Sequence, residues 1–240
     1  MKLNPKLSGV LFALLLSMNV HSQDVCELGL SVGVLFPNFR HTETGTNLTT
    51  PLTLGSRTVL SITCPISERI GLTTGLGRFY FEEGYKFDNL NMIMVGSVWT
   101  YTIPVQVSYQ LVSKSKFRVV YTSGVWFHEN NKYEFFKTRE GEHFTTLDSG
   151  EPGDHVAYSS LSVYNFRRIF PLIEQGVRID FALFHRWLFS IKAGYDFGLY
   201  KIAEINVDYQ YNMGPDESAL IETKGGNLNF SIGLRYKVRR

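Results

Sequence analysis

The stretch "WTYTIPVQVSYQLV", from Trp99 to Val112, alternates between two kinds of side chain. Its odd-numbered positions are apolar or aromatic, whereas its even-numbered positions are mostly polar. A period of two predicts a β-strand with one apolar face and one polar face. The stretch is also long enough to cross a bilayer as a tilted strand, for which about 9–11 residues suffice.

The same alternation recurs along the chain. We find it in seven further segments: Glu27–Phe36, Thr58–Ile66, Ile70–Phe81, Phe117–His128, Leu172–Leu183, Trp187–Tyr200 and Asn227–Val238. The third of these is less regular and indicates a bulge near Arg78 and Phe79. Together with the first stretch they predict an all-β protein of eight antiparallel strands in up-and-down order.

The connections between these segments alternate in length. Three of them read as tight turns: Ser67–Arg69, Ser113–Lys116 and Phe184–Arg186. Four read as long polar loops: Pro37–Ser56, Glu82–Val98, Glu129–Tyr164 and Ala203–Gly226. Short turns at one rim and long loops at the other are typical of transmembrane β-barrels of the outer membrane.

A soluble eight-stranded barrel of the lipocalin kind would alternate too, but with its apolar face inside. Here that face carries large aromatic residues such as Trp99, Trp187 and Phe197, which would overfill so narrow a lumen. Glycines cluster on the polar faces instead, where space in a lumen is short. We therefore favour the membrane barrel, whose lumen is filled by side chains and leaves no open aqueous pore.

The N-terminus has the pattern of a secretory signal peptide over residues 1–22. Lys2 and Lys6 precede the short apolar run Val10–Leu16, and small residues follow at the cleavage positions. The barrel domain would then span residues 23–240. Removing the two lysines lowers the formal charge from +2 to zero, which gives no reason to expect a nucleic-acid partner. Beyond Ser22 the sequence has no apolar run long enough for a membrane helix.

The strand "YTIPVQVSYQL" and the final "SIGLRYKV" resemble the PorT-like, porin-family outer-membrane β-barrel domain of Gram-negative bacteria. Ile103-Pro104-Val105 and the spacing of Gly233 and Tyr236 carry the resemblance most firmly. It implies residence in the cell outer membrane, contact with outer-membrane lipid and assembly by the barrel insertion machinery. The chain departs from many outer-membrane proteins in its tail, since "KVRR" follows Tyr236.

Charged residues on the polar faces predict a charge network in the lumen. Its members are Arg118, Glu174, Arg178, Asp180, Lys192, Asp196 and Arg235. Two interpretations stay open, a polar path for a small solute and a salt-bridged plug that makes the barrel rigid. We favour the plug, because buried charges must be paired and this set contains both signs.

The two cysteines predict a disulfide between Cys26 and Cys64. An exported chain meets an oxidising compartment, and two cysteines allow one bridge. Both lie where an antiparallel pairing of the first two strands would bring them together. In that register Leu28 would oppose Ile62, so the apolar faces would match. The alternative is two unpaired small side chains at the barrel rim.

Histidines on the long-loop side raise the question of an enzyme. His41, His128, His143 and His155 lie there with several carboxylates nearby in sequence. Their spacing matches no metal site, and no nucleophile elbow is present, so we interpret them as solvated loop residues and expect neither catalysis nor a cofactor.

The sequence favours a non-enzymatic barrel with a structural, accessory or partner-docking role. Its long loops, above all Glu129–Tyr164 with "KYEFF" inside, would contact an envelope protein partner. A narrow channel for small solutes is the alternative. An outer-membrane enzyme with a His and carboxylate site at the loop rim ranks third.

Overall fold

The structure is a computed structural model, and it describes residues 26–43, 48–49, 53–87, 93–130, 147–148, 155–165, 168–211 and 215–238. These ranges contain twelve β-strands. No helix in them is long and apolar enough to cross a membrane. The expected signal peptide, the "KYEFF" segment and His143 lie outside the described residues.

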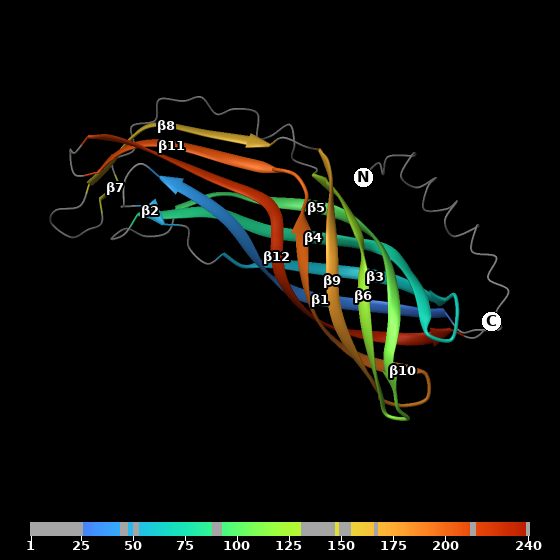
Figure 1. Cartoon of the computed structure of the whole chain (residues 1–240). Helices are drawn as coiled ribbons and strands as arrows, with labels where there is room; N and C mark the ends of the chain where they lie inside the picture. The colour runs from blue at the N-terminus through green and yellow to red at the C-terminus, as the bar shows by residue number, and fades with distance from the viewer. Residues whose placement is uncertain are drawn as a thin grey trace.

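Eight of the strands close into one antiparallel barrel (Figure 1). They are β1 (Cys26–Glu43), β3 (Gly55–Pro65), β4 (Ile70–Phe87), β5 (Ile93–Ser113), β6 (Phe117–Asn130), β9 (Ile169–Ala182), β10 (Trp187–Gly198) and β12 (Asp216–Val238). Each pairs with the next in this order, and β12 pairs with β1 to complete the ring. The predicted fold is confirmed, with every alternating segment in a barrel strand.

The three predicted tight turns are also confirmed. They connect β3 to β4, β5 to β6 and β9 to β10, and they gather at the lower right of Figure 1 with the C-terminal end of β12. We call this the turn end of the barrel and the opposite end the loop end. The predicted bulge in β4 is wrong, because Arg78 and Phe79 continue an unbroken register with β5 and the shift falls between Glu83 and Gly84.

The sequence pattern of β4 is irregular for another reason. Arg78 lies on the outside, where its guanidinium covers the Trp99 ring 3.8 Å from the ring centroid. Phe79 points inward and is buried. A charged residue outside and an aromatic residue inside reverse the usual pattern without any change in backbone register.

The long loops predicted from polarity are partly strands. Four further strands lie there: β2 (Leu48–Thr49), β7 (Leu147–Asp148), β8 (His155–Asn165) and β11 (Ala203–Tyr211). Beyond the end of β10, β11 pairs with residues 216–223 of β12 on one side and with β8 on the other. We call these three segments the outer sheet; they rise at the upper left of Figure 1.

Reading Ala203–Gly226 as a loop was therefore wrong. Ile205, Val207 and Tyr209 alternate with polar residues and are almost fully buried on one face of β11. This face supplies the apolar burial that an extra strand needs. The many charged and amide side chains on the opposite face concealed the alternation in the sequence.

The barrel exterior is apolar through the middle of the strands. Adjacent residues of β10 show the two faces, since Ile191 is 44% exposed and Ser190 only 6%. Leu30, Leu60 and Ile232 are exposed in the same way on neighbouring strands. An apolar outside around a polar inside is the arrangement of a membrane barrel and the opposite of a lipocalin.

Candidate functional site in the barrel lumen

Five charged side chains fill the lumen near the turn end. This turn-side cluster consists of Glu27, Arg118, Arg178, Asp180 and Arg235. Arg118 connects the two carboxylates, with Nη2 2.6 Å from Glu27 Oε2 and Nε 2.7 Å from Asp180 Oδ2. Arg235 Nε donates to Glu27 over 3.0 Å, and Arg178 Nε lies 2.9 Å from Asp180 Oδ1. Each residue of the cluster therefore has a partner of opposite charge.

Hydroxyl groups add to the hydrogen bonding of this cluster. Ser190 Oγ donates to Asp180 over 2.7 Å, and Arg235 Nη2 donates to Thr63 Oγ1 over 2.5 Å. Thr63 Oγ1 lies 2.7 Å from Thr73 Oγ1 on the next strand. Buried ions are tolerated only when such bonds satisfy their remaining donors and acceptors, so the small polar residues of the lumen have a defined role.

A second group, the middle cluster, lies farther from the turn end. It consists of Arg57, Glu174, Lys192 and Asp196. Glu174 is fully buried and accepts from Arg57 Nη1 at 2.6 Å, from Gln106 Nε2 at 3.0 Å and from Lys192 Nζ. Asp196 lies 3.9 Å from Arg57. Two cations and two carboxylates thus balance one another at mid-barrel.

A group of apolar side chains, the apolar layer, borders the middle cluster, and most of its members lie toward the loop end. It is formed by Leu35, Val59, Phe79, Trp126, Phe170, Leu172 and Ile202, all buried. Trp126 also joins the two regions, because the Arg57 guanidinium lies 5.0 Å from its ring centroid. The lumen is therefore occupied by charge pairs near the turn end and by apolar side chains toward the loop end.

His128 lies among these apolar side chains and not in a solvated loop, so that interpretation was wrong for this residue. It is 1% exposed, stacks on Phe170 with ring centroids 5.1 Å apart and meets the Phe79 ring edge-on at 4.8 Å. Its Nδ1 is 3.1 Å from Thr100 Oγ1. β6 extends past His128 to Asn130, so His128 keeps the inward orientation of the even-numbered residues in this strand.

The structure places all seven residues of the predicted network in the lumen, and it divides them between the two clusters. Two members escaped the sequence analysis, Glu27 and Arg57. The alternation of inward and outward residues could have revealed both. Glu27 lies two residues before Gly29 and Arg57 two residues before Val59, so each shares the inward face of its strand. Arg57 was overlooked because it precedes the segment recognised as alternating.

Cys26 and Cys64 are joined by a disulfide, with their Cα atoms 4.3 Å apart. The bridge lies at the turn end, where β1 begins and β3 ends. The register of these two strands is the predicted one, with Leu28 opposite Ile62 and Leu30 opposite Leu60. The bridge joins β1 to its neighbour β3, next to the point where β1 and β12 close the barrel.

No family model and no curated protein matches the chain. Solved structures do resemble it. The outer membrane protein OprG from Pseudomonas aeruginosa is 13% identical with a TM-score of 0.53, over 90% of this chain and 97% of that one. The N-terminal β-barrel domain of Pseudomonas aeruginosa OprF is 9% identical with a TM-score of 0.40, over 87% and 96%.

The likeness to OprG is a likeness of fold. Together with the closed ring of eight strands and the apolar exterior, it identifies the kind of protein. This chain is an outer-membrane β-barrel. Short turns of such barrels face the periplasm, so we expect the turn end at the periplasmic side and the outer sheet outside the cell.

Proposed function

We propose that the protein is a closed, non-conducting barrel of the PorT-like kind, and that it acts without catalysis as a rigid base for a docking surface outside the membrane. One observation carries the proposal. Ion pairs cross the lumen from wall to wall, and an apolar layer borders them toward the loop end.

The ion pairs connect strands on opposite sides of the ring. Glu27 of β1 meets Arg118 of β6, and Arg57 of β3 meets Glu174 of β9. Around the ring, the two strands of each pair are separated by three strands in one direction and by three in the other. A bond of this kind runs across the barrel axis, where a solute would have to pass. Separating such a buried pair leaves charges unpaired at a cost of about 3–5 kcal/mol.

The outer sheet supplies the docking surface. Its buried face holds the sheet in place, whereas its other face carries polar residues such as Glu204, Asn206 and Asp208. Lys201 pairs with Glu204 and Glu222 across β11 and β12, and the hydrogen bond from Lys201 lowers the pKa of Glu204. A paired, hydrogen-bonded strand surface loses less conformational entropy on binding than a loop does.

The environment of His128 supports a role without catalysis. Of the rim histidines it is the one whose side chain the structure describes, and its polar contact is with Thr100 and not with a carboxylate. Within the described residues no three His, Cys, Asp or Glu side chains are grouped as metal ligands would be. A general acid–base pair needs a partner within hydrogen-bond reach.

A narrow channel is the second candidate, because two cavities adjoin within the lumen. One, of about 340 Å³, opens at the turn end and is lined by the Ser67–Arg69 turn and Arg118. The other, of about 60 Å³, lies deeper, between the clusters. Arg178 lines both. The apolar layer beyond the deeper cavity is the reason that we prefer the closed barrel.

Site-specific photocrosslinking in intact cells tests the docking role. A photoreactive residue at Asn206 or Asp208 of the outer sheet should give a discrete adduct with one envelope or extracellular protein. The matched control is Lys116, which is exposed like Asp208 but lies in a turn at the opposite end. Adducts from Lys116 alone, or from none of the three positions, would contradict a docking surface on the outer sheet.

A further inference from the structure

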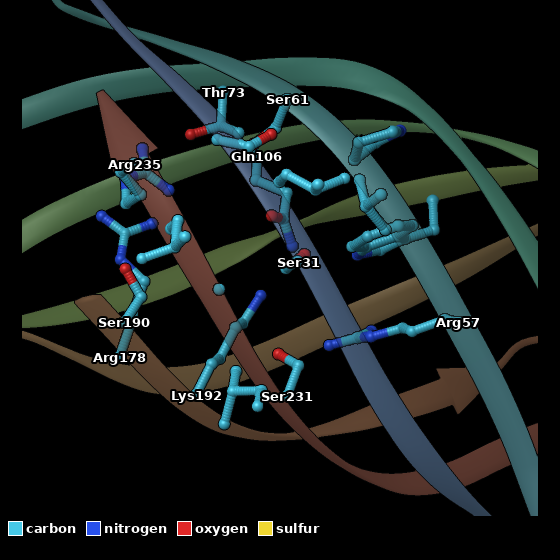
Figure 2. A pocket seen from close by; sticks show the side chains of 18 residues that line it. Ser31, Arg57, Ser61, Thr73, Gln106, Arg178, Ser190, Lys192, Ser231 and Arg235 are labelled. Atoms are coloured by element: carbon cyan, nitrogen blue, oxygen red, sulfur yellow. The ribbon is translucent and has the colours of Figure 1, made fainter. Parts of the chain in front are cut away.

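The deeper cavity has a lining of one charge sign. Arg57, Arg178, Lys192 and Arg235 face it, and no carboxylate belongs to its lining among the described residues (Figure 2). The other polar groups around it are the side-chain amide of Gln106 and several hydroxyls, all of which can donate hydrogen bonds. Each of the four cations also pairs with a carboxylate outside this lining, and Gln106 and Ser190 donate to two of those carboxylates. A cavity lined by cations alone is still chemically suited to an anion, provided that one of them has donors left over.

The lumen as a whole carries an excess of positive charge. Its described members are five cations, Arg57, Arg118, Arg178, Lys192 and Arg235, and four carboxylates, Glu27, Glu174, Asp180 and Asp196. Five minus four leaves one positive charge. An uncompensated charge in a barrel interior is costly, so a bound monoanion would stabilise the folded protein.

Arg178 has donors to offer such an anion. Its side chain is 8% exposed, and its Nε donates to Asp180. Its two terminal nitrogens form no hydrogen bond with any described residue. Because Arg178 also lines the wide cavity at the turn end, it lies between the deeper cavity and the periplasm.

We propose that the deeper cavity binds a small inorganic monoanion, chloride in the periplasm, with Arg178 as its principal ligand. The volume of about 60 Å³ is several times what one water needs, about 10–15 Å³, so a chloride that keeps a few of its waters fits. A nucleotide or a sugar phosphate is too large. The positively charged entrance at the turn end makes the periplasm the source of the ion.

Chloride NMR on the folded protein in detergent tests this proposal. Exchange with a buried site broadens the signal of free chloride. Wild-type protein should give broadening that saturates with chloride and is reversed by bromide at constant ionic strength. The Arg178→Gln variant should lose this component, whereas Arg168→Gln, which removes an exposed arginine at the loop end, should keep it.

A second variant tests the site independently, in case Arg178→Gln does not fold. Ser31→Leu leaves the charges unchanged and fills the cavity with an apolar side chain, so it too should abolish the saturable broadening. Folding of each variant is judged by its faster migration when unboiled. The proposal is overturned if wild-type broadening equals that of the boiled protein, or if folded Arg178→Gln and Ser31→Leu proteins both retain it.

Discussion

Arg57 and Glu174 meet across the full width of the barrel. Arg57 Nη1 of β3 lies 2.6 Å from Glu174 Oε2 of β9, and both side chains are almost completely buried. These strands stand opposite each other in the ring of eight, so the pair joins two walls that share no backbone hydrogen bond. Glu174 is the centre of this connection, because Lys192 and Gln106 also donate to it.

Glu174→Ala should be strongly destabilising. It leaves Arg57 and Lys192 without their shared carboxylate, and breaking a buried pair costs about 3–5 kcal/mol. The measurement is the free energy of unfolding from urea titration of the barrel refolded in detergent. The matched control is Glu129→Ala, which removes the partner of Arg168, a side chain 63% exposed, and should cost about 0–1 kcal/mol. Equal losses in the two variants would show that the transverse pair does not hold the walls together.

Ile191→Arg should impair membrane assembly. Ile191 is 44% exposed on the outer face of β10, where it faces lipid, and Arg near the bilayer midplane costs about 2–4 kcal/mol. The measurement is the fraction of heat-modifiable protein recovered from outer membranes, with Ile191→Leu as the control of similar size. Recovery of Ile191→Arg at the level of Ile191→Leu would argue against a lipid-facing position.

Cys26 and Cys64 should be bonded in protein taken from the cell envelope. Mass spectrometry without reduction is expected to find one peptide pair carrying both residues and no free thiol. Replacing both by serine should lower the free energy of unfolding by about 2–4 kcal/mol, because the bridge restricts the unfolded chain. Two free thiols in envelope-extracted protein would refute the bridge.

The two ends of the barrel should differ in access from outside the cell. In a Cys26→Ser, Cys64→Ser background, a cysteine in place of Asp208 in the outer sheet should react with a membrane-impermeant maleimide on intact cells. A cysteine in place of Lys116 in the β5–β6 turn should react only after the outer membrane is permeabilised. The reverse pattern would mean that the orientation is inverted.

Alternation in the sequence was sufficient to predict the barrel because the two faces of each strand lie in different environments. Stretches such as Trp99–Val112 expose one face to lipid and the other to a polar lumen, so the period of two is nearly unbroken. The same parity placed Glu174 and Asp180 inside. It also predicted the register of β1 and β3, since only one register brings Cys26 and Cys64 together with both apolar faces aligned.

Pairing across the lumen could not be predicted in the same way. Which residues meet depends on the tilt and stagger of strands that are not neighbours, and these follow from closure of the whole ring. Arg57 and Glu174, 117 positions apart, share no local signal. The outer sheet was missed because the buried face of β11 is short and its other face resembles a solvated loop. His128 ends the predicted strand Phe117–His128 on its inward face, but it was assigned to the solvated rim because the two further residues of β6, Glu129 and Asn130, were read as loop.

The central claim is that the lumen is closed, and single-channel recording in planar bilayers tests it most directly. Wild-type protein that is shown to be folded by its faster unboiled migration should insert without producing conductance steps in concentrated potassium chloride. This expectation rests on the ion pairs that cross the axis and on the apolar layer that includes Trp126. Reproducible ohmic steps from the folded wild-type protein would contradict the account and favour the narrow channel.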